Sequence, residues 1–168
     1  MKPVLSLQPP RICLATLDIA AELLNLQRLC FREEAELNQV FDIPPLTQSL
    51  ESLREDFRTH TILAAWQGNW LVGSVRGRRD GAVGRISRLV VHPDYRQHGL
   101  GPKLLAAIEA AFPGVEAYEL FTGERSERNL RLYQELGYVP FRREAVTPRL
   151  TLVHLHKRRP PSLEMPPD

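Results

Sequence analysis

A loop with two glycines lies directly after an apolar, β-branched run and directly before an amphipathic segment of the chain. The apolar run stops at Pro93, and the two glycines are Gly99 and Gly101. Glycine lacks a Cβ, so the main chain can bend sharply there and come close to a ligand. The start of a helix adds unpaired N–H groups and the positive end of its dipole. The sequence therefore predicts a backbone site for an anion, with a diphosphate as the natural guest.

A second candidate site lies on a later amphipathic segment, where Asn129 and Tyr133 are four residues apart. Residues at this spacing share one face of a helix. A phenol with a reference pKa of about 10 stays protonated at neutral pH, so it can donate a proton in a reaction. The alternative is a tyrosine half-buried against a sheet with its hydroxyl in water. This segment alone leaves Tyr133 as either a general acid or a packing residue.

The segments that must position these residues alternate between strand and helix patterns. Short β-branched runs or apolar residues at every second position predict strands, and a period near 3.6 predicts helices. Strands are expected at residues 12–17, 61–66, 70–75, 83–91, 117–122, 139–145 and 149–156, and helices at 19–36, 47–57, 102–112 and 126–136. The order β-α-α-β-β-β-α-β-α-β-β predicts an α/β fold with a central mixed sheet and helices on both faces.

Particular residues mark the expected ends of these elements. Thr47 is expected to cap the second helix, after a loop at residues 38–46 that contains two adjacent prolines. Residues 67–69 form a turn signal between two strands of an antiparallel hairpin. Pro102 suits the first position of the third helix, and Gly137 is expected to end the fourth.

Length and composition fit a single domain. The 168 residues can bury a two-layer core, and a chain with 43% hydrophobic and 25% charged residues is ordinary for a globular protein. We expect residues 11–158 to be ordered, and the two ends, residues 1–10 and 159–168, to be flexible.

Charge and cysteine content narrow the classes of partner. The net charge of +2 and the lack of a basic cluster with interleaved aromatic residues argue against nucleic acid as a partner. No run of about 18 apolar residues and no leader pattern occurs, so neither a membrane nor secretion is expected. Cys13 and Cys30 each lie in an apolar segment and are interpreted as core thiols, which fits a reducing, cytoplasmic location. No metal site is expected.

Both candidate sites resemble motifs of one superfamily, the GNAT N-acetyltransferases. The glycine loop meets its pattern Arg/Gln-x-x-Gly-x-Gly/Ala with Arg96, Gly99 and Gly101. The segment 129–138 is similar to its pattern Asn-x-x-x-Tyr-x-x-x-Gly-Phe/Tyr. The resemblance covers residues 12–157 and is most specific over residues 85–138. Two motifs in the right order favour the general-acid interpretation of Tyr133 over packing.

The resemblance implies that the chain binds acetyl-CoA largely through its backbone. The strand before the glycine loop would pair with the pantetheine amides as an added strand does, and the loop backbone would hold the pyrophosphate. Asn129 would bond the pantetheine arm, and Tyr133 would act as catalytic general acid near the thioester sulfur. The cofactor-binding residues expected are Leu89, Val90, Val91, Arg96, Gln97, His98, Gly99, Leu100, Gly101, Lys103 and Asn129.

Two of these side chains have an alternative interpretation, and two positions depart from the family pattern. Arg96 either contacts a phosphate or is solvated, and His98 either takes part or is a surface histidine. Pro102 has no N–H, so one backbone donor is missing from the phosphate site. Ser87 occupies the strand position where many relatives carry a carboxylate base.

The base and the acceptor pocket are therefore left with weaker candidates. Glu119 is the nearest alternative base, although a strand glutamate more often faces solvent. His92, before Pro93, is expected to shape the turn. Three acidic residues fall in the region where the family builds its acceptor pocket and would either attract a cationic amine or form a solvated face: Glu33, Glu34 and Asp42.

The expected function is transfer of an acetyl group from acetyl-CoA to a primary amine on a small molecule or a peptide. The amine would attack directly in a ternary complex, since neither Cys13 nor Cys30 is expected near the site. The N–H near Val90 would polarise the thioester carbonyl. The rivals are a non-catalytic acyl-CoA-binding or regulatory domain of the same fold, and a nucleotide diphosphate site, for which no P-loop motif is present. The acceptor, the acyl-chain preference and a homodimer stay open.

Overall fold

Seven strands form one mixed sheet in the computed structural model, which describes residues 8–160. The spatial order of the strands is β1-β2-β3-β4-β5-β7-β6. Neighbouring strands are antiparallel except β4 and β5, which are parallel. The strands are β1 (Arg11–Leu14), β2 (Thr61–Gln67), β3 (Trp70–Asp80), β4 (Val83–Val91), β5 (Ala117–Gly123), β6 (Val139–Thr147) and β7 (Leu150–Arg158). Most of the two ends expected to be flexible, residues 1–10 and 159–168, lies outside the described residues.

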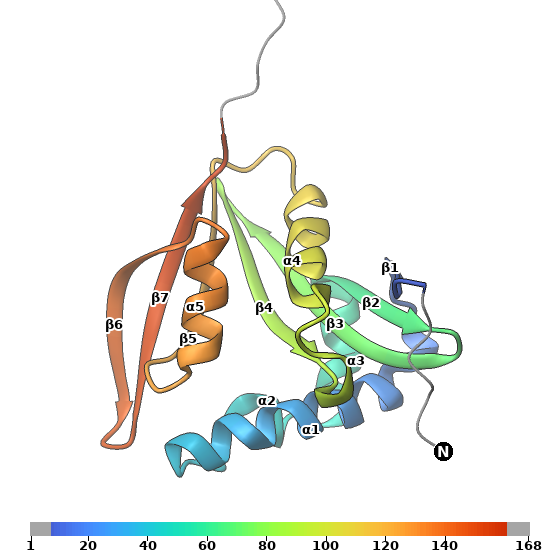
Figure 1. The fold of residues 1–168 in the computed structure, drawn as a ribbon, viewed down its shortest axis with the longest axis horizontal. Helices are drawn as coiled ribbons and strands as arrows, with labels where there is room; N and C mark the ends of the chain where they lie inside the picture. The colour runs from blue at the N-terminus through green and yellow to red at the C-terminus, as the bar shows by residue number, and fades with distance from the viewer. Residues whose placement is uncertain (1–7, 161–168) are drawn as a thin grey trace, which may run out of the picture.

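Helices cover both faces of the sheet, as predicted (Figure 1). The helices are α1 (Ala20–Asn38), α2 (Pro44–Thr47), α3 (Leu50–Thr59), α4 (Leu100–Ala110) and α5 (Glu127–Glu135). On one face, α1 and α3 bury leucines such as Leu23 and Leu53 against β2 and β3. On the other face, α4 packs Leu104 and Ile108, and α5 packs Tyr133, over β3, β4 and β5. Successive side chains of a strand point to opposite faces of the sheet. On β3, Leu71 therefore packs under α1 and α3, whereas Val72 packs under α4 and α5.

The two parallel strands at the centre separate along their length. The pairing of β4 with β5 extends only from Val83, opposite Ala117, to Arg85, opposite Glu119. Beyond these residues the strands diverge, as Figure 1 shows. The sheet is therefore open between the second half of β4 and the second half of β5.

A bulge marks β4 where the strands diverge. Ser74 of β3 lies opposite Val90, whereas Arg76 lies opposite Ser87, so β4 has one residue more than β3 over this stretch. Arg88 lies within the bulge and has a left-handed φ of 54°. A bulge bends its strand and leaves an extra residue outside the ladder.

Four predicted boundaries are wrong, for local reasons. Strand β1 ends at Leu14 instead of residue 17, because residues 17–19 turn into a short 3-10 helix before α1. Thr47 does not cap a helix, because it ends the short helix α2 inside the predicted loop. The cap of α3 is Ser49, whose Oγ accepts a hydrogen bond from the Ser52 nitrogen at 3.1 Å. Helix α4 begins at Leu100 instead of Pro102. Proline is tolerated there because N–H groups in the first turn have no partner within the helix. Strand β3 also continues past residue 75 to Asp80, paired with β4 despite its polar sequence.

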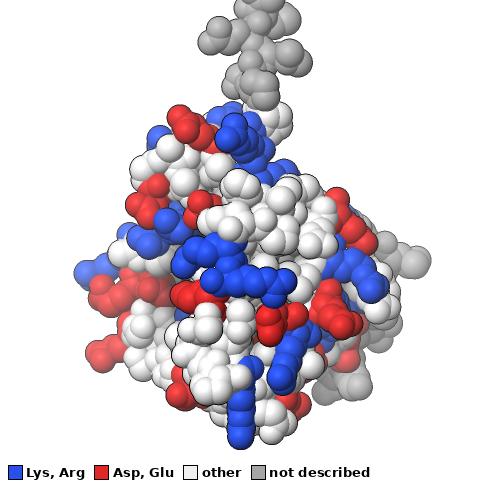
Figure 2. Space-filling view, turned by 90° about the vertical axis from the view of Figure 1, so that its left-hand side faces the viewer, with Lys and Arg blue, Asp and Glu red and all other residues white. Residues whose placement is uncertain are grey.

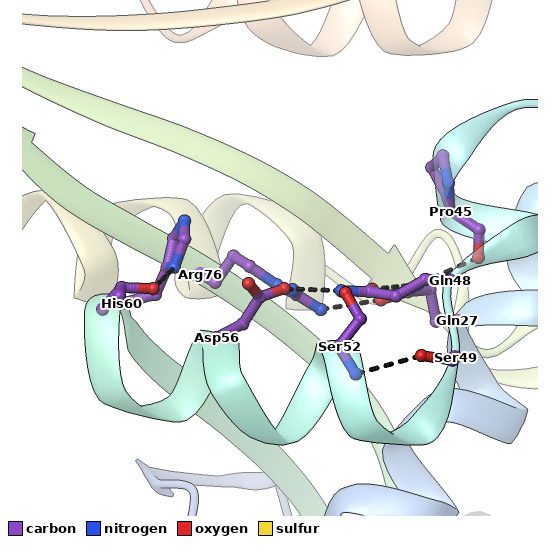
Figure 3. A network of polar contacts seen from close by, with 9 residues as sticks. Gln27, Pro45, Gln48, Ser49, Ser52, Asp56, His60 and Arg76 are labelled. Atoms are coloured by element: carbon purple, nitrogen blue, oxygen red, sulfur yellow. Dashed lines mark hydrogen bonds and ion pairs between the residues drawn. The ribbon is translucent and has the colours of Figure 1, made fainter.

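A buried guanidinium joins the helices of one face to the sheet (Figure 3). The side chain of Arg76 on β3 is 4% exposed, and its Nη1 lies 2.5 Å from Asp56 Oδ2 on α3. Its Nη2 donates to Gln27 Oε1 on α1 at 2.7 Å. Gln27 in turn donates from Nε2 to the Pro45 carbonyl of α2 at 2.9 Å. Burial lowers the pKa of Arg76 to about 10, so the side chain keeps its charge at neutral pH. This network fixes α2 relative to α1 and β3.

We expect Asp56→Asn to lower the free energy of unfolding by about 3 kcal/mol, because it leaves the Arg76 charge buried without its anion. Urea unfolding at pH 7 measures the change. The matched control is Asp80→Asn, which breaks the exposed pair with Arg85 at 2.7 Å and should change stability little. Equal losses in the two variants would contradict a structural role for the buried network.

Candidate functional site

A cavity of about 910 Å³ occupies the opening between β4 and β5. Its wall comes from both diverging strands, from the sheet-facing side of α1, from α2, from the glycine loop and from α5. It therefore connects both motifs that the sequence singled out. Residues far apart in the chain meet here only because the central strands separate.

The glycine loop has the geometry of an anion site. His92 shapes the turn as expected, because its Nδ1 accepts from the Asp94 nitrogen at 3.1 Å. Gln97 has φ 65° and Gly99 has φ 79°, and Gly99 is the residue before the first turn of α4. A Cβ placed on Gly99 would meet no atom within 4 Å, so the backbone there is open to a ligand. The free N–H groups at the start of α4 supply donors and a positive dipole end. The loop thus fits the diphosphate of a coenzyme A group.

Most of the expected cofactor residues line this cavity. Those along its wall are Leu89, Val91, Arg96, Gln97, Gly99, Leu100, Gly101 and Asn129. Val90, His98 and Lys103 are not on the wall, and the Val90 side chain is buried in the cluster under α1 and α3. The contacts expected of Val90 and Lys103 use backbone atoms, so they stay predictions.

Arg96 is bound to the protein itself. Its Nε donates to the Val91 carbonyl at 3.2 Å, and its Nη1 lies 2.6 Å from Glu33 Oε2 on α1. Its side chain is 18% exposed, so it is neither free nor fully solvated. Arg96 therefore ties the glycine loop to α1, and a phosphate near it would share the guanidinium with Glu33.

Tyr133 is buried in the wall of the cavity, with 6% of its surface exposed. Its ring packs edge-on against Tyr138, with 6.0 Å between ring centroids. Burial and the negative charge of Glu34 raise the pKa of its hydroxyl well above the ordinary value. The phenol is therefore protonated at neutral pH, the state that a general acid requires.

Glu34 is held inside the cavity by Asn129 of α5 and by Ser126, the residue before that helix. Its Oε1 accepts a hydrogen bond from Asn129 Nδ2 at 3.1 Å and another from the Ser126 hydroxyl. Of the three acidic residues expected near an acceptor pocket, Glu34 and Asp42 line the cavity, whereas Glu33 pairs with Arg96 and Arg128. The side-chain amide of Asn129 thus already donates a hydrogen bond to the Glu34 carboxylate. Its contact with pantetheine stays a prediction.

The side chains considered as base or nucleophile are placed differently. Glu119 pairs with Arg85 at 3.1 Å and is absent from the cavity wall, whereas Ser87 lies on it. The expectation that neither cysteine lies near the site is wrong for Cys30, which lines the cavity. Its Sγ lies 3.4 Å from the Val91 carbonyl, and burial raises the thiol pKa to about 11. A protonated thiol is a poor nucleophile, so direct attack by the amine remains the simpler chemistry.

Several residues of the wall escaped the sequence analysis. Arg88 lies in the β4 bulge, and the bulge leaves no mark in the sequence. The prolines of α2 also line the cavity, and the Pro-Pro pair in a predicted loop was the available signal. Asn38, at the end of α1, is 4% exposed and faces the same space.

Positive and negative side chains are mixed on the surface of the face that carries β6 (Figure 2). Figure 2 shows Lys and Arg side chains beside Asp and Glu side chains, with uncharged surface between them, on the face toward which β6 lies in Figure 1.

Within residues 8–160, no three or more His, Cys, Asp and Glu side chains gather as metal ligands would. No helix in that range has the length and apolar character needed to cross a membrane.

Comparison with known proteins agrees with this geometry. The acetyltransferase (GNAT) family matches residues 20–138. Over 71% of this chain, the sequence is 28% identical to UPF0157 protein YqkA of Bacillus subtilis. Over 56% of this chain, it is 28% identical to the N-terminal acetyltransferase B complex catalytic subunit NAA20 of Arabidopsis thaliana. It spans 34% of the first relative and 66% of the second.

A solved structure shows the same fold. The PaiA N-acetyltransferase of Thermoplasma acidophilum, in complex with coenzyme A, has a TM-score of 0.76 at 14% identity, over 90% of this chain and 100% of that one. The family match extends from α1 to the residue after α5 and its closing glycine, and includes both motifs. The chain belongs to the GNAT family of acetyltransferases, which are acetyl-CoA-dependent acyltransferases.

Proposed function

We propose that this protein transfers the acetyl group of acetyl-CoA to a primary amine that attacks directly in a ternary complex. The observation that carries the proposal is the cavity in the β4–β5 opening, which extends from the open backbone at Gly99 to the protonated phenol of Tyr133. The glycine loop and α4 would hold the pyrophosphate, and the free edge of β4 would pair with the pantetheine arm.

The chemistry requires two proton movements. The amine nitrogen bonds to the thioester carbonyl carbon, the C–S bond breaks, and the sulfur leaves as a thiolate. Tyr133 supplies the proton that neutralises this thiolate, since its phenol is protonated and lines the cavity. The N–H near Val90 polarises the carbonyl, and the cavity brings the reacting groups together. The amine proton passes to water held by Ser87 and strand carbonyls.

The acceptor is a small-molecule or peptide amine. Glu34 and Asp42 give the α1–α2 side of the cavity an acidic character, which suits a cationic amine. A reducing location such as the cytoplasm fits the two cysteines, Cys13 and Cys30, which are both unpaired.

Two measurements test this function. Thermal unfolding with acetyl-CoA, ATP or NAD distinguishes the ligand class, because a ligand at a hundred times its Kd stabilises the fold by roughly 2.7 kcal/mol. A screen of amines, antibiotics, polyamines and peptide N-termini for release of CoA then identifies the acceptor. Stabilisation by acetyl-CoA without release of CoA from any acceptor would favour the non-catalytic acyl-CoA-binding domain.

The pH dependence tests how the amine is deprotonated. An alkylamine with a pKa near 10.4 loses its proton at pH 7 at a cost of roughly 4.6 kcal/mol. Without a side-chain base, kcat/KM should rise with pH toward the pKa of the acceptor and shift with that pKa. The raised pKa of Tyr133 keeps the donor protonated over this range, so no fall from tyrosine ionisation should appear below about pH 10.

The control for the pH profile is Glu119→Gln, which should leave it unchanged because Glu119 faces Arg85. The measurement is kcat/KM from pH 6 to 10 with two acceptors whose amine pKa values differ by about one unit. A plateau that stays fixed across acceptors and vanishes in Glu119→Gln or in Glu34→Gln would show that this carboxylate is the base.

A further inference from the structure

Arg88 is a guanidinium in the cavity wall without an anion of its own. Its Nε is buried and has no hydrogen-bond partner, and within residues 8–160 the side chain makes no ion pair. Burial lowers the pKa of Arg88, which means that its charge is poorly solvated. A half-buried cation with a buried, unpaired N–H is costly unless something pairs with it.

Among residues 8–160, the carboxylate that acts on Arg88 is already paired with another cation. Asp56 is the carboxylate whose charge acts on Arg88, but its Oδ2 already lies 2.5 Å from Arg76. The charges of Arg76 and Arg88 also act on each other, so two cations share one carboxylate on this side of the sheet. Of these two guanidinium groups, Arg88 is the one that lines the cavity.

The backbone at Arg88 supports a functional interpretation. The residue has φ 54° within the β4 bulge, a conformation that costs energy for a non-glycine side chain. Bulges commonly redirect a side chain beside an active site. Arg88 lies in this bulge, the charges of Asp56 and Arg76 interact with its own, and its side chain lines the cavity.

Hydrogen-bond acceptors lie elsewhere in the same cavity. Glu34 carries a negative charge beside Tyr133, and Asp42 adds another on the α1–α2 side. Asn38 donates from Nδ2 to the backbone carbonyl of Glu34 at 2.8 Å, and its buried Oδ1 has no hydrogen-bond partner. The cavity therefore offers carboxylates and an amide oxygen for a cationic amine, and a guanidinium without an ion pair for an anion.

We propose that the acceptor is a free amino acid, whose amine binds on the Glu34 side of the cavity and whose carboxylate is held by Arg88. The inference rests on the proposed acetyl transfer and adds the chemical class of the acceptor. The planar guanidinium of Arg88 lines the cavity, and its fork of N–H donors matches a carboxylate geometrically. A simple amine would leave Arg88 unpaired, so a carboxylate on the acceptor supplies what the protein lacks.

The test compares amino acids with their primary amides, which have the same shape without the charge. The pairs are 4-aminobutyrate with 4-aminobutanamide, L-leucine with L-leucinamide, and L-phenylalanine with L-phenylalaninamide. For at least one pair, kcat/KM for the acid should exceed that for the amide by roughly 10- to 100-fold, the range of a charge-assisted hydrogen bond. An α-amide lowers the pKa of its own amine, so intrinsic reactivity works against this preference.

In Arg88→Gln the acid-to-amide ratio should fall to one or below, through loss of activity with the acid alone. Arg88→Lys keeps the charge without the fork and should retain part of the preference. The control is Arg78→Gln, at an exposed position of β3 outside the cavity wall. A merely structural role of Arg88 would lower activity with acid and amide equally and leave the ratio unchanged.

Calorimetry of the same acids and amides on the CoA-loaded protein separates this inference from the proposed function. Binding of the acid that depends on Arg88, without acetyl transfer, would support the site and overturn the transferase function. Acetylation of amines without preference for the acid, or a preference that survives in Arg88→Gln, would overturn the site and leave the function intact. Neither binding nor turnover with any pair would overturn both.

Discussion

Replacement of Gly99 by valine should lower the affinity for acetyl-CoA by more than about 100-fold while the protein stays folded. The backbone at Gly99 is open, with no atom within 4 Å of the point where a Cβ would lie, so a valine side chain would occupy the space expected for the pyrophosphate. Two lost charge-assisted hydrogen bonds at about 1.5 to 3 kcal/mol each account for a loss of this size. Calorimetric titration with acetyl-CoA measures it directly.

The backbone strain that Gly99→Val introduces has to be separated from its effect on acetyl-CoA affinity. Gly99 has φ 79°, a conformation that a β-branched residue adopts at a cost of roughly 1–3 kcal/mol. Gly81, in the turn between β3 and β4, has φ 60° and is equally open. Gly81→Val is therefore a matched control that should lose similar stability but bind acetyl-CoA normally. Unchanged affinity in Gly99→Val would show that the glycine loop is not the phosphate site.

Replacement of Tyr133 by phenylalanine should lower kcat by roughly 10²-fold or more, the usual contribution of a general acid. The ring and its packing against Tyr138 remain, and only the hydroxyl is lost. Acetyl-CoA affinity should barely change, because the phosphate and pantetheine contacts expected of this fold come from the backbone. Steady-state kinetics at saturating acetyl-CoA and acceptor, together with calorimetry, measure the two quantities separately.

Tyr138→Phe is the matched control for this loss. Tyr138 is 1% exposed and lies against Tyr133, but its hydroxyl donates to Glu109 Oε1 at 3.3 Å and it is absent from the cavity wall. Its removal should cost stability by about 1–2 kcal/mol and leave kcat unchanged. If Tyr133→Phe also kept its full kcat, Tyr133 would be a packing residue, and the thiolate would take its proton from solvent.

The order of the elements and both motifs could be read from the sequence because each depends on residues close together in the chain. Strand β4 has the bounds that were predicted, and the alternation of apolar residues correctly placed helices on both faces of the sheet. The glycine spacing indicated the left-handed turn before α4, since few other residues adopt that conformation. The predicted starts of two helices were wrong. Helix α3 is capped by Ser49 instead of Thr47, and α4 follows Gly99 directly instead of beginning at Pro102.

The shape and charge of the site were decided by contacts between distant segments. Asn129 and Glu34 are 95 residues apart, and Arg96 and Glu33 are 63 apart, yet each pair meets at the cavity. These contacts, and the Arg88 side chain whose Nε has no partner, exist because β4 has a bulge and separates from β5 after three paired positions. The sequence by itself determined the family, the element order and the two local motifs, whereas only the tertiary structure decided which charges are paired and which remain for a ligand. The physical reason is that pairing depends on distance in space, and separation along the chain does not reveal it.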